Sequence, residues 1–406
     1  MTFLYDIVNL EVVLILYFLV VYYLRLDVLK SFLILGHLIA VFLLNDVLFD
    51  SAYWPDQRNY LMTTMNIREQ FVSLLGLDSG IIDYEGLSMD VTSRKGLPSY
   101  IFAFSPIPFI NSVQSIAMIN FLLYLLSFVY LRKKGVSSNS VDFFFLLYPS
   151  FLLYSSVALR ETLIILFMIL SLYFFLVEEK SLTAFIFLLP LVIIKIQNFL
   201  ILILAYFIYI YLRKGSIQRY LIFLGAGILV IFFGSYFPLI NFFFEKIDYY
   251  RWSLIAENYR YNWDFMANYD YQPFEGGFSM IPLLVKSFMY MLFMPFPWEA
   301  TNLVQLIQSV ENIFIIALIV WVVRIKVHSL IIKRKLVFLN IIFILSMTIY
   351  GLVTFNFGAA ARFRFPFILV YLIFYLYLLR TDNIISRQVY GVYSSLSIRT
   401  QRFRSS

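Results

Sequence analysis

Apolar residues along this chain gather in long runs that short polar segments separate. Eleven of these runs approach the length of about 20 residues that a helix needs to cross a bilayer, although several are shorter. The runs cover roughly 3–24, 31–49, 112–131, 141–158, 161–177, 182–195, 198–212, 220–240, 300–323, 336–355 and 365–380. The pattern predicts an all-α polytopic membrane protein with about 11 transmembrane helices.

One further apolar segment, 278–296, is predicted to behave differently. Lys286 interrupts it, and prolines stand near both of its ends. A full crossing by this segment would move the basic loop 324–335 to the outer side, against the positive-inside rule. We therefore expect an interfacial helix on the outer side of the membrane.

The composition agrees with a membrane protein and excludes other classes. Hydrophobic residues make up 62% of the chain and charged residues only 14%, which is far from the balance of a soluble domain. Cysteine is absent, and His37 and His328 are too far apart in the sequence for a zinc or haem site. No nucleotide-binding motif is present. We therefore expect no cofactor, no metal and no nucleic acid partner.

The basic residues predict how the helices are oriented. With the N-terminus outside, the cytoplasmic segments hold 19 of the 31 Lys and Arg residues but only 5 of the 24 Asp and Glu residues. This asymmetry follows the positive-inside rule and places the C-terminus inside.

This orientation predicts one transmembrane domain over residues 1–386, followed by a basic, disordered cytoplasmic tail over 387–406. Two large outer loops cover about 50–111 and 241–299, whereas the cytoplasmic loops are short. Because polar residues gather in the outer loops, we expect the function to lie on the outer face.

The segment NFGAAARFRFPF, residues 356–367, carries the first candidate site. It places Arg362 and Arg364 at the outer mouth of a membrane helix, beside the small residues 358–361. Arginine at membrane depth is costly, and its rigid fork of donors matches phosphate oxygens. A positive anchor at a cytoplasmic helix end is the alternative, and the predicted outer position argues against it. We expect Arg362 to be catalytic and Arg364 to bind substrate.

Two more basic residues lie at predicted outer turns. Arg160 stands directly before Glu161, and this pair is either an internal salt bridge or a clamp on the substrate. Lys195 interrupts an apolar run and is either a snorkelling interfacial lysine or a substrate-binding residue. Arg160 joins the catalytic candidates, and Lys195 joins the candidates for substrate binding.

In the first outer loop, Asp56 and Arg58 stand close to Tyr53, Trp54 and Tyr60. Aromatic faces beside a carboxylate suit a sugar ring, and a carboxylate can accept the proton of an attacking hydroxyl. Asp56 is therefore a candidate catalytic base and Arg58 a candidate for substrate binding. An aromatic belt at the membrane interface is the alternative interpretation.

The second outer loop mixes aromatic and charged residues and has no glycine-rich linker. Arg251 and Arg260 lie in this mixture, and Trp298 follows later in the same outer region. Such a lining resembles a contact surface for carbohydrate or glycolipid. We expect these three residues to contact substrate.

Three motifs, in their order along the chain, resemble those of one family of membrane enzymes. They are YPS at 148–150 with ALRE at 158–161, PFPW at 295–298, and FGAAARFRFP at 357–366. Over most of the chain this layout resembles the Wzy-type oligosaccharide repeat-unit polymerases, or O-antigen polymerases, and their exopolysaccharide relatives of the EpsG kind.

The resemblance implies a GT-C-like helical fold, related to that of O-antigen ligases, in the bacterial cytoplasmic (inner) membrane. It implies a metal-independent glycosyltransferase of polysaccharide or lipopolysaccharide biosynthesis that joins undecaprenyl-diphosphate-linked oligosaccharides at the outer face. These lipid-linked substrates, membrane lipids and a chain-length regulator are the implied partners. The arginines that grip the diphosphate are carried over onto Arg160, Arg362 and Arg364.

Other functions fit parts of the same pattern. A GT-C glycosyltransferase that uses a polyprenyl-phosphate sugar would depend on an acid in the first outer loop, which is where Asp56 stands. An O-antigen ligase would share most of the predicted features. A lipid-linked oligosaccharide flippase or other transporter would place charges at the bilayer midplane and show paired repeats, and neither is evident here.

Overall fold

The computed structural model of the 406-residue chain describes residues 2–45, 48, 55–74, 96–103, 112–213, 217–233, 236–261, 273–274 and 277–402. In parts of several helices, including 257–261 and 386–402, only the backbone is described. The chain divides into two compact units, Met1–Leu200 and Ile201–Ser406. The single transmembrane domain expected over 1–386 stays a prediction.

Helices account for all the regular secondary structure among the described residues, so the predicted all-α class is confirmed. Within the described part of the chain, five helical stretches are long and apolar enough to cross a bilayer. They are Ile7–Leu24, Val113–Lys133, Leu303–Arg324, Leu330–Val353 and Phe357–Ile385. Several other apolar helices are shorter, so the predicted count of about 11 spans is not confirmed.

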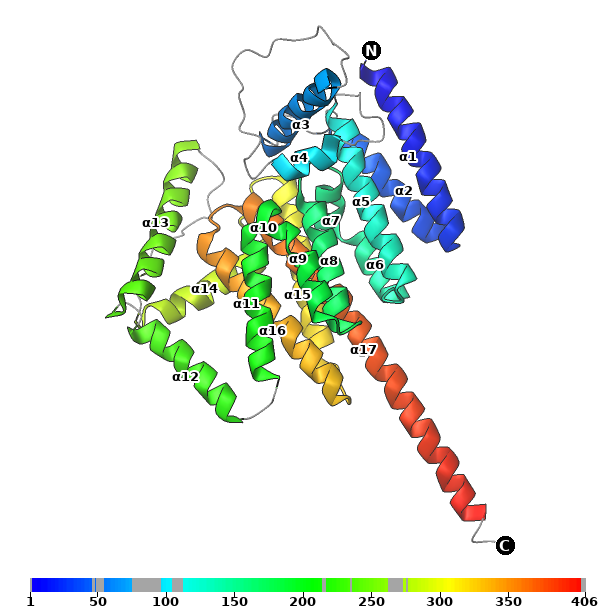
Figure 1. Cartoon of the computed structure of the whole chain (residues 1–406), viewed down its shortest axis with the longest axis vertical. Helices are drawn as coiled ribbons and strands as arrows, with labels where there is room; N and C mark the ends of the chain where they lie inside the picture. The colour runs from blue at the N-terminus through cyan, green and yellow to red at the C-terminus, as the bar shows by residue number, and fades with distance from the viewer. Residues whose placement is uncertain are drawn as a thin grey trace. The chain divides into compact units, whose positions relative to one another are not determined.

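The first unit is built around α5, whose residues are mostly buried. In Figure 1, α5 runs beside α1 and α2, and it also contacts α3, α4, α7 and α8. The helices of this unit are α1 Thr2–Leu24, α2 Val28–Leu44, α3 Pro55–Leu74, α4 Gly96–Ala103, α5 Val113–Lys133, α6 Asn139–Leu147, α7 Pro149–Ser155, α8 Glu161–Leu176, α9 Ser181–Leu188 and α10 Pro190–Ile194.

The second unit is centred on α16, which packs against α13, α14 and α17. Its helices are α11 Ile196–Leu212, which begins in the first unit, α12 Ile217–Phe233, α13 Pro238–Tyr261, α14 Met280–Phe293, α15 Leu303–Arg324, α16 Leu330–Val353 and α17 Phe357–Arg402. The last helix also packs against α14 and α15.

Prolines split two of the predicted membrane runs. The run 141–158 becomes α6 and α7, which meet at Pro149, and the run 182–195 becomes α9 and α10, which meet at Pro190. Proline lacks the N–H that an inner helical position donates, and its ring clashes with the preceding turn. Both prolines therefore stand at the first position of a new helix, where neither effect matters.

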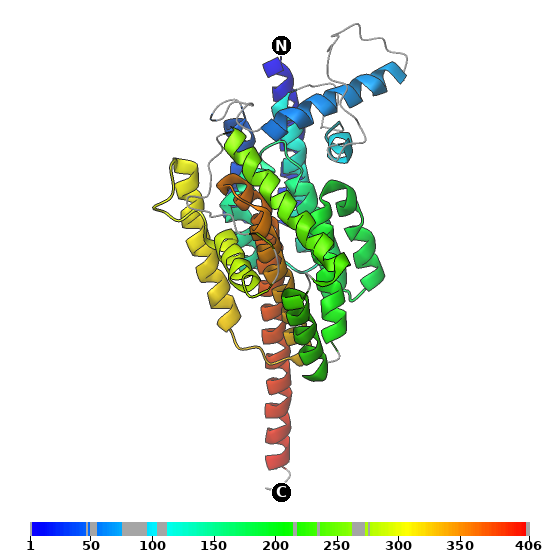
Figure 2. The same ribbon diagram turned by 90° about the vertical axis from the view of Figure 1, so that its left-hand side faces the viewer.

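The two segments predicted to be outer loops contain helices. The first holds α3 and α4, and the second holds most of α13, a helix of 24 residues, and all of α14. The expected disorder of the C-terminal tail is also wrong as far as Arg402, because α17 continues to that residue. Figure 2 shows this helix running on without a break. Extending a formed helix needs no new nucleus, which favours continuation over disorder.

The segment expected to be interfacial forms α14, and its 14 residues span about 21 Å at 1.5 Å per residue. That is shorter than the roughly 30 Å of a hydrocarbon core. The helix packs very closely on α16. A Cβ atom added to Gly351 of α16 would lie 2.0 Å from the carbonyl oxygen of Ser287 in α14. Only glycine permits this approach of the two backbones.

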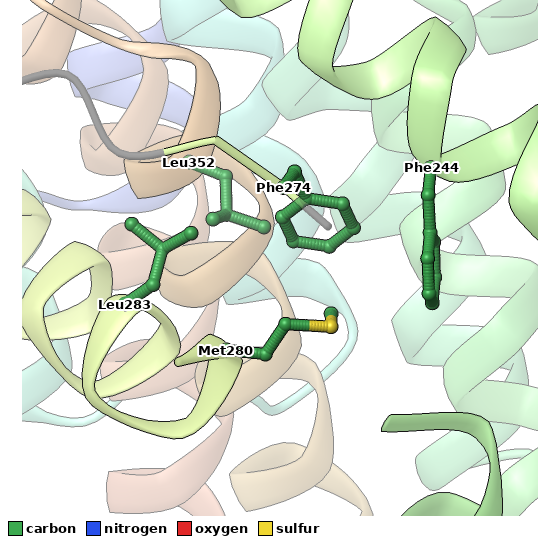
Figure 3. Close-up of a cluster of buried hydrophobic side chains, with 5 residues drawn as sticks. All are labelled: Phe244, Phe274, Met280, Leu283 and Leu352. Atoms are coloured by element: carbon green, nitrogen blue, oxygen red, sulfur yellow. The ribbon is translucent and has the colours of Figure 1, made fainter. Parts of the chain in front are cut away.

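An apolar cluster joins α13, α14 and α16 in the second unit. Figure 3 shows its five buried side chains, and Phe274 comes from the connection that leads to α14. The rings of Phe244 and Phe274 meet edge to face, with their centroids 5.2 Å apart. The cluster consists of Phe244, Phe274, Met280, Leu283 and Leu352. It fixes α13 on the rest of the unit.

Candidate functional site

In the described part of the chain, four arginines donate hydrogen bonds to carbonyl groups at the ends of helices. Arg68 bonds the end of α4, Arg160 that of α10, Arg251 that of α16 and Arg364 that of α14. The last four carbonyls of a helix have no partner within the helix, and buried carbonyls need a partner from elsewhere. An arginine that bonds such carbonyls stabilises the fold. This structural role is the alternative to substrate binding for each candidate arginine.

Arg364 is held by the fold. Its side chain is 1% exposed, and one guanidinium nitrogen donates to Met291 O at 3.0 Å and to Met294 O at 2.7 Å. Asn312 of α15 donates to the same Met294 O at 3.1 Å. The two side chains together fix the end of α14 between α15 and α17. The sequence predicted that Arg364 binds substrate. In the structure, its Nη1 instead donates to two backbone carbonyls.

Arg362 lies on a more open face of α17. It is half-buried, and it stands four residues after Gly358, which places both on one side of the helix. Gly358 is exposed, and the nearest atom to a Cβ added there is Asn356 Oδ1 at 3.9 Å. The Asn356 side chain also accepts from Ala359 N and so caps the start of α17. The positive end of this helix therefore favours an anionic group beside Arg362.

The structure adds a polar face of α15 that the sequence analysis did not single out. Gln308, Glu311 and Asn312 are buried, and their spacing of three and four residues puts them on one side of the helix. Gln308 donates to Phe357 O at the start of α17, and Asn312 donates to Phe293 O and Met294 O. The spacing of these polar residues at i, i+3 and i+4 inside an apolar run is the sequence pattern that could have predicted this face.

The remaining candidates of the second unit differ in burial. Arg251 is fully buried, donates to Leu352 O at 2.9 Å and lies 3.6 Å from the Asp248 carboxylate. It thus joins α13 to the end of α16. Trp298 is 78% exposed and stacks on Phe296 at 4.7 Å, so it is available for contact with a ligand. The backbone of Arg260 lies in the last turn of α13, and its side chain is outside the described residues.

In the first unit, Asp56 and Arg58 lie in the first turn of α3. Asp56 is half-buried and Arg58 is exposed. A carboxylate in the first helical turn interacts favourably with the positive end of the helix dipole. The two side chains are therefore placed where solvent or a ligand can reach them.

Arg160 and Lys195 are brought together at the broken helices of the first unit. Arg160 stands directly before α8 and donates to Ile194 O at 2.8 Å. Ile194 is the last residue of α10, and Lys195 follows it directly. Lys195 is 8% exposed, so the lysine is more deeply placed than a snorkelling side chain. The Nε of Arg160 is buried and makes no hydrogen bond to another described residue. Part of its guanidinium group therefore remains for another acceptor.

Three amide side chains hold the irregular turn that precedes Arg160. Asn45 Nδ2 donates to Ser156 O at 2.8 Å, and Asn120 Nδ2 donates to Val157 O and Leu159 O at 2.5 and 2.6 Å. Gln57, the neighbour of Asp56, accepts from the backbone N–H of Ala158 at 3.1 Å. All three amides are almost fully buried. The turn lies outside any helix, yet its polar groups are satisfied by side chains.

The candidates thus form two groups. Asp56, Arg58, Arg160 and Lys195 belong to the first unit, whereas Arg362, Arg364, Arg251, Arg260 and Trp298 belong to the second. A joint clamp of Arg160 and Arg362 on one diphosphate stays a prediction. Among the described residues, no group of three or more His, Asp or Glu side chains is placed to hold a metal ion.

Arg68, which the sequence analysis did not consider, shows how burial changes the pKa of an arginine that bonds a helix end. It donates to Phe102 O and Ala103 O, and burial lowers the pKa of its guanidinium group to about 10. The side chain nevertheless keeps its charge near neutral pH. It therefore bonds these carbonyls as a cation.

In comparisons with known proteins, no family model, curated protein or solved structure matches this chain. The functional argument therefore depends on the residues themselves.

Proposed function

We propose that this protein is a polymerase that joins lipid-diphosphate-linked oligosaccharide repeat units at the outer face of a bacterial cytoplasmic membrane. The observation that carries the proposal is the separation of the two arginines of α17. Arg364 bonds the end of α14, whereas Arg362 lies half-buried beside the exposed Gly358 at the start of the helix. The chain thus places a guanidinium group, at high cost in a membrane protein, beside the start of a helix, whose positive end favours an anion.

In the proposed reaction, a sugar hydroxyl of the acceptor unit attacks the anomeric carbon of the growing chain. The new glycosidic C–O bond forms as the bond to the diphosphate breaks, and lipid diphosphate leaves with the electron pair. Its negative charge grows during this step, so a fixed guanidinium group stabilises the transition state more than the ground state. Asp56 is the proposed acceptor of the hydroxyl proton. If attack is direct, the anomeric configuration inverts.

The test compares Arg362→Ala and Arg362→Lys with the parent, in membranes supplied with lipid-linked repeat units. We expect Arg362→Ala to reduce chain extension by about 100-fold, the order of effect seen when one transition-state donor is removed. Lysine should restore little, because it keeps the charge but loses the two-pronged geometry. Arg380→Ala, at an exposed position of the same helix, is the matched control and should leave chain lengths unchanged.

Unchanged polymer lengths with well-expressed Arg362→Ala would remove the diphosphate clamp from this account. The same experiment separates polymerisation from earlier steps, because assembly and flipping of single units precede it. Single lipid-linked units should therefore accumulate on the outer leaflet of the Arg362→Ala strain.

A GT-C glycosyltransferase that uses a polyprenyl-phosphate sugar is the second candidate. It is favoured by the position of Asp56 in the first turn of α3, one residue before the amide that holds the Arg160 turn. The two functions differ in which loss is more damaging. If Asp56→Asn abolishes transfer while Arg362→Ala leaves it intact, the monophosphate-sugar transferase is the better account.

A further inference from the structure

The turn that carries Arg160 depends on side chains from three other helices. The carbonyls of Ser156, Val157 and Leu159 accept from the amides of Asn45 and Asn120, as described above. Without these bonds the turn would leave several buried backbone groups unsatisfied, which would destabilise it. The path of the chain into Arg160 is therefore set by tertiary contacts and not by local sequence preference.

Gln57 has a special place among these amides because it uses both ends of its side chain. Its Oε1 accepts from Ala158 N at 3.1 Å, and its Nε2 donates to Asn45 Oδ1 at 2.8 Å. Asn45 in turn donates to Ser156 O. Gln57 thus closes a ring of bonds that joins the first turn of α3, the end of α2 and the turn before α8.

Two of the candidate catalytic residues lie close in sequence to members of this ring. Asp56 directly precedes Gln57, and Arg160 follows Ala158 by two residues, a chain length of about 7 Å at most. One hydrogen bond therefore separates the stretch of chain that carries the acid from the stretch that carries the guanidinium group. A shift of α3 on this turn would change the distance between the two.

We propose that Gln57 is a positioning residue, which holds Asp56 and Arg160 in one site of the first unit. The acid and the guanidinium group of this site would face a sugar phosphate, with the carboxylate toward the sugar hydroxyl and the guanidinium toward the phosphate oxygens. The catalytic part of this inference rests on the proposed function, whereas the link between α3 and the Arg160 turn does not.

The link is tested by distance measurement between two spin labels. Because the chain contains no cysteine, labels attach only at introduced sites. Arg58→Cys in α3 and Ser140→Cys in α6 are both exposed positions of the first unit. Adding Gln57→Leu should broaden or shift the distance distribution measured by pulsed electron paramagnetic resonance. Thr63→Val is the matched control, because the Thr63 hydroxyl bonds Asn59 O within α3. It should leave the distribution unchanged.

The positioning role is tested by steady-state kinetics on the same substitutions without labels. A displacement of about 1 Å between catalytic groups can cost about 100-fold in rate. We expect Gln57→Leu to lower kcat per folded molecule by about 10- to 100-fold, with a much smaller change in KM. Thr63→Val should keep the parent kcat. A purely stabilising role for Gln57 would instead reduce the amount of folded protein and leave its kcat unchanged.

Gln57→Glu provides a rescue that depends on pH. A protonated carboxyl accepts from Ala158 N–H and donates to Asn45 Oδ1, as the amide does, whereas the ionised form cannot donate. Burial favours the protonated form. The variant should therefore work better than Gln57→Leu and lose activity as pH rises, in a step that the parent does not show.

The outcomes separate the two parts of the inference. An unchanged distance distribution in Gln57→Leu overturns the link, whatever the activity. A changed distribution with unchanged kcat overturns the positioning role. If the parent shows no glycan transfer, the proposed function fails, and the distance measurement still decides whether Gln57 joins the two stretches of chain.

Discussion

Gly351→Ala should disrupt the packing of α14 on α16. The added Cβ would lie 2.0 Å from Ser287 O and 2.6 Å from the carbonyl carbon of Ser287. Both are backbone atoms, so no side-chain rotation relieves the overlap. The two helices must separate by about 1 Å before the contact becomes tolerable, and overpacking of this kind typically costs about 1–3 kcal/mol. Alanine regains up to about 1 kcal/mol of helix propensity, so the net loss is smaller than the strain.

The strain should extend to the end of α14. Arg364 and Asn312 both donate to Met294 O, just past the end of this helix, and a displaced α14 would lengthen those bonds. We therefore expect the second unit to lose stability and hydrogen-exchange protection in α14, α15 and the start of α17. The first unit should keep its protection.

The assay is thermal unfolding of the purified protein in detergent, followed by circular dichroism, with hydrogen exchange at peptide resolution. The expected decrease in Tm is several degrees, on the basis of about 2–4 °C for each kcal/mol in a domain of this size. Gly225→Ala in α12 is the matched control, because no described atom beyond the adjacent backbone of its own helix lies within 4 Å of its added Cβ. It should leave Tm unchanged or raise it. An unchanged Tm and unchanged exchange in Gly351→Ala would refute the close contact.

Further outcomes follow from the same structure. Single cysteines read by a membrane-impermeant thiol reagent should report cytoplasm at Ser138 and the outer side at Asn258, and the reverse pattern would invalidate the predicted topology. The hydrogen bond from Lys30 N–H and the nearby Lys30 charge lower the pKa of Asp27 in the folded protein. The Asp27 carboxylate therefore stabilises the folded protein above its unfolded pKa, and this stabilisation is lost as pH falls through its lower folded pKa. In Asp27→Asn, Tm should therefore fall less on acidification than it does in the parent. A fall of the same size in both proteins would contradict this prediction. Arg364→Lys should lower Tm and the folded yield, because lysine cannot reproduce the guanidinium fork, and a parent-like Tm would show that the two carbonyl bonds add little.

The sequence alone determined the membrane class and the all-helical fold, whereas two apolar runs that contain proline were wrongly expected to be unbroken. These properties depend on local composition and on the chemistry of single residues. Pro149 and Pro190 each begin a new helix because a proline N–H is missing wherever it stands. The expected disorder after residue 386 failed because composition does not show that an existing helix already leads into the segment.

Only the tertiary structure decided what each arginine does. The spacing of Arg362 and Arg364 predicts that the two point in different directions, but it does not say which one meets the interior. The carbonyls that hold Arg364 lie 70 and 73 residues away in sequence, at the end of a helix whose placement no local pattern encodes. In the same way, Gln57 is one polar residue among many until folding brings it to Ala158, 101 residues further on. Hydrogen bonds over such separations depend on how helices pack, and packing is a property of the whole unit and not of any segment within it.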